Sequence, residues 1–175
     1  ELYLDDTSLS DLAVSFGTPS YVYSASLIKD NFLEYKDSIR MNDKVCFAVK
    51  SNSNINILKL LNSLGSGFDV VSGNELKRCL VAGADPKNIV FSGIGKTKEE
   101  IRLAVENNIF SINIESESEL ERIIKIAEDT GRKVNCAIRV NPDISAESHP
   151  YITTGLKTSK FGVTSQVALT MSKRI

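Results

Sequence analysis

Short apolar runs alternate with longer amphipathic stretches from about residue 43 onward. The apolar runs predict strands at 45–49, 68–71, 89–92, 111–114 and 134–140, with a short sixth strand at 161–163. Apolar residues at three- and four-residue spacing predict helices at 55–64, 74–82, 98–107, 118–129 and 166–174. Regular alternation of strand and helix is typical of βαβ units and a parallel sheet. The pattern therefore predicts an α/β fold.

A polar residue stands at the end of each of the first five predicted strands. These residues are Lys50, Asp69, Ser92, Glu115 and Arg139, and successive members are 19, 23, 23 and 24 residues apart. Neighbouring parallel strands lie about 5 Å apart, so we expect the five side chains to line one rim. The C-terminal rim of a (β/α)8 barrel carries its catalytic groups. A plainer interpretation is that a polar residue ends any strand, because the chain meets water there.

The length of the chain limits how much of a barrel it can form. Its 175 residues supply five or six strand–helix units, whereas a complete (β/α)8 barrel takes about 250 residues. We therefore expect the N-terminal part of a longer chain, with residues 31–175 forming part of a parallel (β/α)8 TIM-type barrel. An open half-barrel leaves an edge strand and one apolar sheet face bare. A complete doubly wound domain of this size is the alternative.

Composition and charge exclude several classes of partner. The 21 basic and 22 acidic residues give a net charge of -1, so no positive excess is available to bind nucleic acid or an anionic membrane. No apolar run approaches the roughly 20 residues that span a bilayer, and the N-terminus lacks the features of a secretory signal. We expect a cytoplasmic protein. Cys46, Cys79 and Cys136 are widely separated in apolar surroundings, which favours buried thiols over a disulfide or a metal site.

Lys50 is the most informative residue of the predicted rim. It follows an apolar strand and precedes the polar segment 51–54. Partial desolvation at such a position favours a neutral, nucleophilic amine that can form an imine with an aldehyde. The alternative is a strand-end lysine that extends its charge into solvent.

The residues around Lys50 resemble a known cofactor-binding motif. The segment FAVKSN at 47–52 resembles the cofactor-lysine motif of the pyridoxal-phosphate decarboxylases with an alanine-racemase-type barrel. Further segments occur in the family's order: GFDVVSGNEL at 67–76, VFSGIGKTKEEI at 90–101, NIESESEL at 113–120 and RVNPD at 139–143. The stretch HPYITTGLKTSKFG at 149–162 resembles the diaminopimelate branch rather than the ornithine or arginine branches. The resemblance covers nearly the whole chain.

The resemblance implies roles for four residues. Lys50 is expected to be the catalytic lysine and to bind pyridoxal 5'-phosphate as an imine. Ala48, two residues earlier on the same strand face, is expected to pack against the pyridine ring, where a bulkier side chain could not fit. Asp69 and Arg139, on neighbouring rim positions, are expected to be opposite charges near the lysine and the cofactor's phenolic oxygen. A structural ion pair is the alternative for these two charges.

The resemblance also implies a reaction and an assembly. The reaction is decarboxylation of meso-2,6-diaminopimelate to L-lysine, the last step of lysine biosynthesis, by a homodimer. The groups that bind the phosphate, the pyridine nitrogen and the substrate are expected beyond Ile175. Residues 1–30 are expected to contribute to a second β domain, with 21–23 as the donated strand. We therefore expect the 175-residue chain alone to bind the cofactor weakly and not to turn over.

Three alternatives to this function stay open on the sequence. A sister decarboxylase acting on D-ornithine or D-lysine shares the barrel and much of the motif at 149–162. A non-catalytic pyridoxal-phosphate-binding barrel protein would bind cofactor without decarboxylation. An inactive regulatory paralogue would be a binding protein, although such proteins usually lose cofactor contacts, and Lys50 is present.

Three further features carry less information. The segment GIGKT at 93–97 hints at a phosphate loop, but Val90 stands where the Walker pattern needs glycine, so a nucleotide site is not expected. The glutamate run at 115–121 is interpreted as a helix start with a solvated face. His149, the single histidine, is expected to order its loop rather than transfer protons. No metal site is expected.

Overall fold

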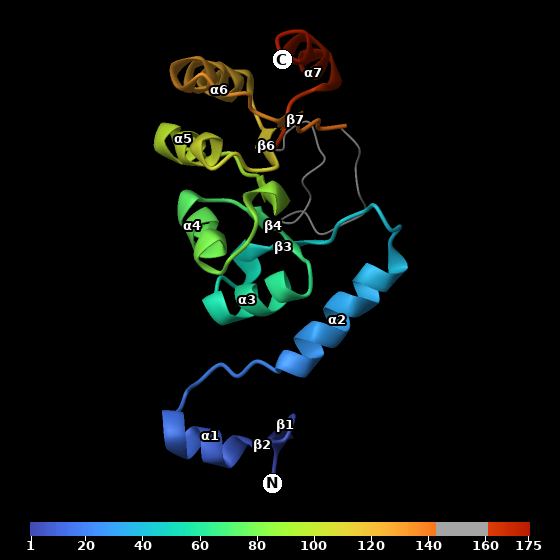
Figure 1. Ribbon diagram of the computed structural model, residues 1–175, viewed down its shortest axis with the longest axis vertical. Coiled ribbons are helices and arrows are strands. Elements are labelled where there is room, and N and C mark those ends of the chain that lie inside the picture. The colour runs from blue at the N-terminus through green and yellow to red at the C-terminus, as the bar shows by residue number, and fades with distance from the viewer. Residues whose placement is uncertain (143–160) are drawn as a thin grey trace.

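The computed structural model describes residues 1–142 and 161–175. Its N-terminal part is a small lobe in which β1 (Tyr3–Leu4) and β2 (Thr7–Ser8) form an antiparallel hairpin followed by α1 (Leu9–Phe16). A longer helix, α2 (Ala25–Ser38), connects this lobe to the main body and packs against the first helix of the sheet region. Figure 1 shows the lobe at one end of the molecule, apart from the main sheet.

The main body is a parallel five-stranded sheet whose strands are ordered β3-β4-β5-β6-β7. The strands are β3 (Cys46–Ala48), β4 (Gly67–Val70), β5 (Ile89–Phe91), β6 (Ser111–Ile114) and β7 (Cys136–Ile138). The helices are α3 (Ile55–Ser63), α4 (Gly73–Val81), α5 (Lys98–Glu106), α6 (Glu117–Thr130) and α7 (Ser165–Ser172). Short 3-10 turns occur at Val49–Ser51 and Pro86–Asn88. The predicted α/β fold of repeated strand–helix units is confirmed.

One face of the sheet is covered by helices and holds the core. In Figure 1, α3, α4, α5 and α6 lie in a row along this face. Phe68 and Val70 of β4, Phe91 of β5 and Ile112 and Ile114 of β6 are fully buried beneath them. Asp69 and Asn113, which alternate with these residues, point to the opposite face and are half-buried. The alternation places polar side chains on the face that is the inside of a barrel.

Some predicted elements differ from the structure at their ends. The first sheet strand is shorter than predicted, because the chain turns at Val49–Ser51. The predicted sixth strand at 161–163 is reduced to a single parallel bridge between Val140 and Val163. Residues 21–23 are neither helix nor strand in the structure. Within 1–142 and 161–175, no helix combines the length and apolar composition needed to cross a bilayer.

The cysteine prediction is correct only in part. All three thiols are free, and Cys79 is buried as expected. Burial raises the pKa of the Cys79 thiol to about 12 and that of the half-buried Cys136 thiol to about 11. Cys46 is exposed, because β3 is an edge strand with no neighbour on its outer side among the described residues.

The start of α5 is stabilised by a capping box. The Thr97 hydroxyl accepts a hydrogen bond from Glu100 N, and Glu100 Oε2 accepts one from Thr97 N at 2.9 Å. Glu100 Oε1 also accepts a hydrogen bond from Gly73 N at 2.6 Å, which ties α5 to α4. We expect Thr97→Ala to lower the free energy of unfolding by about 1 kcal/mol, because one helix donor loses its acceptor. Urea unfolding of the full-length protein measures this change, with Thr170→Ala in α7 as the control expected to change little.

Candidate functional site

A pocket lies at the carboxyl ends of the sheet strands. Its volume is about 540 Å³, within the roughly 300–1,000 Å³ range of small-molecule sites. All five predicted rim residues line it: Lys50, Asp69, Ser92, Glu115 and Arg139. The expectation that these five side chains line one rim of the sheet is therefore confirmed. We call this cavity the rim pocket.

Lys50 enters the rim pocket from a turn rather than from the strand itself. It is the middle residue of the 3-10 turn Val49–Ser51, which is held in place where Ser51 Oγ donates to Ala48 O at 2.7 Å. Val49 is fully buried and fixes the turn against the core. Lys50 is exposed, and its Nζ makes no hydrogen bond or ion pair with any described residue. A primary amine is thus available at the mouth of the pocket.

Ala48 lies beneath this turn, in register with Asp69 of the neighbouring strand. Lys50 lies in the turn rather than in the strand, so the prediction that Ala48 and Lys50 share one strand face stays a prediction. Ala48 is half-buried and lines an adjoining cavity of about 620 Å³ beside α2. Its contact with a cofactor ring stays a prediction.

Asp69 is fixed by a hydrogen-bond chain that crosses three strands. Ser92 Oγ donates to Asp69 Oδ1 at 2.5 Å, and Asn113 Nδ2 donates to Ser92 Oγ at 3.0 Å. Because the amide can only donate through Nδ2, the hydroxyl must turn its proton toward the carboxylate. The chain therefore holds Asp69 as an acceptor on the floor of the rim pocket. Sequence analysis identified Asp69 and Ser92 at the rim but gave no sign of Asn113.

Arg139 and Asp69 do not occupy neighbouring rim positions as predicted, and they do not form the ion pair that was the alternative. Two strands, β5 and β6, separate them in the sheet, so the two residues share the pocket without being neighbours. Arg139 Nη1 instead donates to Glu115 Oε1 at 3.1 Å, and its guanidinium lies over the Phe161 ring, 4.7 Å from the ring centroid. Glu115 follows β6, the strand beside β7, which makes it the natural partner.

Glu115 is a buried carboxylate with three donors. Its side chain is 3% exposed. Besides Arg139, it accepts hydrogen bonds from Gly93 N at 3.2 Å and Gly162 N at 3.1 Å. Gly162 has φ of +73°, and a Cβ there would lie 2.7 Å from Arg139 O, so only glycine fits this approach. The predicted solvated face of the 115–121 run is wrong for Glu115 and for Glu119, because both are buried among polar partners.

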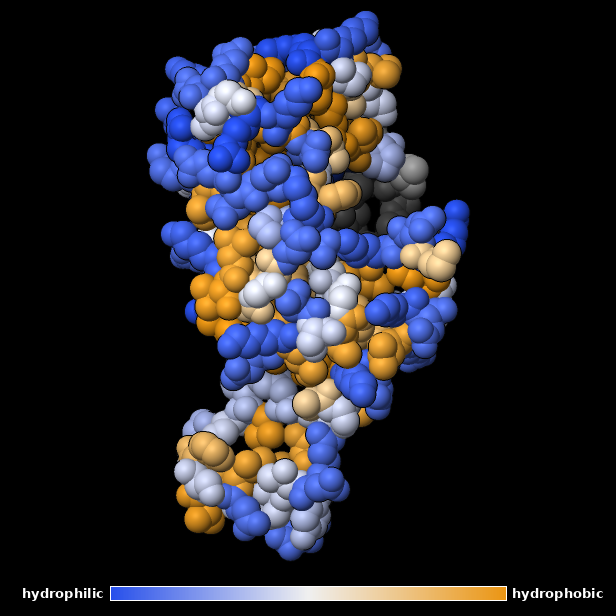
Figure 2. Space-filling view, in the orientation of Figure 1, coloured by the Kyte–Doolittle hydropathy of each residue, from blue (hydrophilic) through white to orange (hydrophobic). Residues whose placement is uncertain are grey.

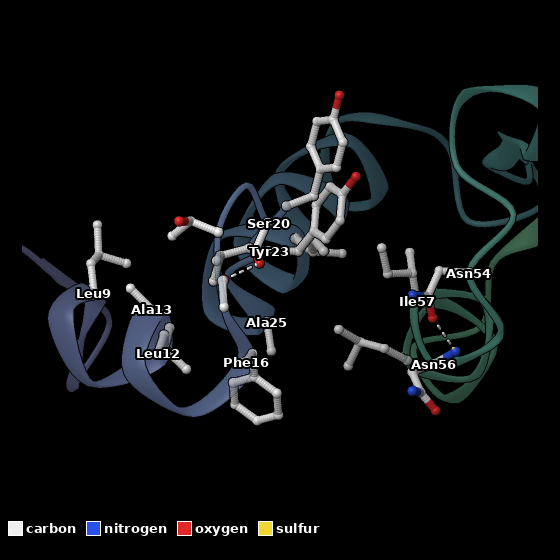
Figure 3. Close-up of a pocket in the computed structure, with 16 residues that line it drawn as sticks. Leu9, Leu12, Ala13, Phe16, Ser20, Tyr23, Ala25, Asn54, Asn56 and Ile57 are labelled. Atoms are coloured by element: carbon white, nitrogen blue, oxygen red, sulfur yellow. Dashed lines mark hydrogen bonds between the residues drawn. The ribbon is translucent and has the colours of Figure 1, made fainter.

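A third cavity, distinct from the rim pocket and from the cavity beside α2, lies between the N-terminal lobe and α3. It has a volume of about 550 Å³ and is lined mainly by apolar side chains. Figure 3 shows Leu9, Leu12 and Phe16 of α1 on one side and Ile57 of α3 on the other. Apolar surface also gathers around a hollow in this lobe in the space-filling view (Figure 2). No lysine, arginine or carboxylate is among the described residues that line this cavity.

Two other sequence features can be placed. The Lys96 amine of the 93–97 segment is used inside the protein, where it donates to Gly93 O and Asn113 O at 2.6 and 2.7 Å. His149 and most of the 149–162 motif lie outside the described residues. Among the residues described, no cluster of three or more histidine, cysteine or carboxylate side chains is placed to bind a metal ion.

Comparison with known proteins gives the class of this chain. Residues 25–175 match the pyridoxal binding domain of the pyridoxal-dependent decarboxylases, and the chain belongs to this family. Diaminopimelate decarboxylase of Pseudomonas aeruginosa is 49% identical over 164 residues, which are 93% of this chain and 40% of that protein. The chain thus spans about 40% of the length of such relatives.

Solved structures agree with this assignment. Diaminopimelate decarboxylase from Helicobacter pylori, complexed with L-lysine, is 46% identical with a TM-score of 0.89, covering 94% of this chain and 42% of that chain. The M. jannaschii enzyme, also with L-lysine, is 39% identical with a TM-score of 0.87, covering 98% and 42%. A lysine/ornithine decarboxylase from Vibrio vulnificus is 18% identical with a TM-score of 0.75 and shares the fold.

The residues of the rim pocket fit a pyridoxal cofactor. Lys50 presents an amine that makes no hydrogen bond or ion pair with a described residue, and Asp69 and Arg139 place opposite charges in the same pocket. The pocket lies at the strand ends, where barrels of this type bind their ligands.

Proposed function

We propose that the protein to which this chain belongs decarboxylates meso-2,6-diaminopimelate to L-lysine with pyridoxal 5'-phosphate, and that this chain carries the cofactor lysine. The observation that carries the proposal is the position of the Lys50 amine. It lies at a pocket that also contains Asp69 and Arg139, and it makes no hydrogen bond or ion pair with a described residue. Relatives named diaminopimelate decarboxylase at 45–49% identity support the substrate. The lysine/ornithine decarboxylases are too distant to support a second candidate.

The chain's own residues bind and orient the reacting groups. When bound, pyridoxal phosphate supplies an electron sink for the electron pair left by departing carbon dioxide. Lys50 would hold the cofactor through its side-chain amine at the mouth of the rim pocket. Arg139 is close enough to the pocket to bind an anionic oxygen on the ring, while Glu115 limits the directions its guanidinium can take. Ala48 leaves room beside the ring because its side chain is small.

Asp69 and its hydrogen-bond chain keep a fixed negative charge near the lysine. The hydrogen bond from Ser92 Oγ to Asp69 Oδ1 fixes the position of this carboxylate. In the proposed mechanism Asp69 would place a negative charge beside the amine with which Lys50 holds the cofactor.

The remaining parts of the proposal concern the whole protein. We infer a cytoplasmic homodimer in which residues 1–30 contribute to a second β domain and 31–175 form part of the barrel. The exposed apolar side chains of the lobe, including Phe16, Tyr21 and Tyr23, support a packing partner for that segment. The groups that bind phosphate, pyridine nitrogen and substrate are assigned to the rest of the polypeptide.

Substrate choice tests the proposal directly. We expect the full-length protein to release carbon dioxide from meso-2,6-diaminopimelate with kcat/KM at least about tenfold above the values for D-lysine, D-ornithine, L-lysine and L-ornithine, because these four amino acids lack the distal carboxylate that diaminopimelate carries beside its distal amine. Capture of labelled carbon dioxide measures each rate. A preference for D-ornithine or D-lysine would overturn the proposed substrate. Cofactor binding without any decarboxylation would instead identify a non-catalytic pyridoxal-phosphate-binding protein.

A further inference from the structure

A buried ion pair lies directly behind the wall of the rim pocket. Lys96 Nζ and Glu119 Oε1 are 2.9 Å apart, and their side chains are 0% and 2% exposed. Neither residue lines the pocket, so neither reaches a ligand there. The Lys96 amine also donates to Gly93 O and Asn113 O, which satisfies all three of its protons.

The second oxygen of Glu119 fixes the neighbouring rim residue. Glu119 Oε2 accepts a hydrogen bond from Glu115 N at 2.7 Å. The cap of α6 strengthens this arrangement, because Ser116 Oγ accepts a hydrogen bond from Glu119 N at 3.3 Å. Glu115 therefore leaves β6 with its backbone direction set by a buried carboxylate, and its own carboxylate is directed at Gly93 N, Gly162 N and Arg139.

These contacts form a continuous series with a cation at each end and two carboxylates between them, the carboxylates being linked through the backbone N–H of Glu115. It runs from Lys96 through Glu119 and Glu115 to Arg139, and it crosses from β5 to β7. Arg139 is the member that lines the pocket and is partly exposed, with a side chain 40% accessible. A long, partly exposed arginine has many rotamers, so a fixed carboxylate on one side determines where its charge lies.

We propose that Lys96 and Glu119 are positioning residues that act through Glu115 to hold the Arg139 guanidinium in the rim pocket. The inference rests on the proposed cofactor function, because it treats Arg139 as a cofactor contact. A buried pair that served stability alone is replaceable by apolar side chains of similar volume with little loss. Here such a replacement also removes the acceptor for Glu115 N and the donor to Gly93 O and Asn113 O, which form the wall of the pocket.

A double-mutant cycle with the full-length protein tests the proposal. Equilibrium dialysis measures the Kd for pyridoxal phosphate in the wild type, Glu119→Gln, Arg139→Gln and the double variant. We expect Glu119→Gln to raise Kd roughly fivefold to tenfold in the wild-type background and less than about twofold beside Arg139→Gln, because coupled residues are non-additive. Thermal unfolding of each variant is recorded in parallel, since a purely structural role affects both backgrounds equally.

A charge-free variant and a remote ion pair complete the design. Lys96→Met with Glu119→Leu removes both buried charges together, which avoids an unpaired charge if Glu119→Gln does not fold. This variant is expected to lose cofactor affinity to the same extent. Asp129→Asn breaks the exposed pair with Arg102 and is expected to leave Kd unchanged.

The possible outcomes separate the two levels of the proposal. Equal losses of affinity in both Arg139 backgrounds, or a charge-free variant that folds and binds as the wild type does, overturn the positioning role. A wild-type protein that does not bind pyridoxal phosphate overturns the proposed function, and the positioning role with it.

Discussion

Replacing Lys50 with alanine is expected to lower the rate of diaminopimelate decarboxylation by at least about three orders of magnitude, because it removes the group that forms a covalent bond with the cofactor. Lys50 is exposed on a turn and makes no contact with the described residues through its amine, so the fold is expected to persist. Captured carbon dioxide gives the rate, and thermal unfolding verifies that the variant is folded.

Chemical labelling identifies the same residue independently. Borohydride reduction of the cofactor-loaded, full-length protein, followed by peptide mapping, is expected to place the label on Lys50. Lys59, exposed on α3, provides the matched control. Lys59→Ala is expected to retain both the label and the activity. Label spread over exposed lysines, or an active Lys50→Ala variant, would remove Lys50 from the mechanism.

The second large effect is expected at Glu115, where substitution affects stability. Glu115→Ala leaves Gly93 N and Gly162 N without their acceptor and frees the Arg139 guanidinium. Because Arg139 is partly exposed, its released charge is solvated at small cost, and the unpaired backbone donors make up most of the loss. We expect the free energy of unfolding to fall by about 2–4 kcal/mol.

Urea unfolding of the full-length protein measures this change, and the chain offers a matched control two residues away. Glu117 is an exposed acid in the first turn of α6, so Glu117→Ala is expected to cost about 0.5 kcal/mol through the helix dipole alone. Equal effects at the two positions would mean that the buried hydrogen bonds of Glu115 contribute nothing to stability.

The periodicity of apolar residues predicted most of the fold, because the side chains that must be buried recur at the spacing of the helix or strand that buries them. The strand 111–114 and the helices at 98–107 and 118–129 match β6, α5 and α6 to within one residue at each end. The five rim residues were located by spacing alone, since a repeated strand–helix unit places equivalent positions side by side. The two ends of β7 and the 161–163 segment were less predictable, because short irregular segments and single bridges leave no periodic signal.

Pairing within the site could not be derived from spacing. The family resemblance placed Arg139 beside Asp69, whereas sheet order makes Glu115 the neighbour of Arg139. The burial of Glu119 was equally hidden, because an acidic run at a helix start is usually solvated. Its partner Lys96 is 23 residues earlier in the chain, so only the three-dimensional arrangement reveals that the two charges meet.

The order of strands in the sheet follows the order of strands in the chain. Within the described residues, each strand from β4 to β7 therefore pairs with the strand that was synthesised immediately before it. At about 5–20 residues per second of translation, successive units emerge from the ribosome one to several seconds apart, far longer than the microseconds in which helices and hairpins form. The residues of the rim pocket can thus emerge from the ribosome and come together in chain order, from Lys50 to Arg139 four strand–helix units later.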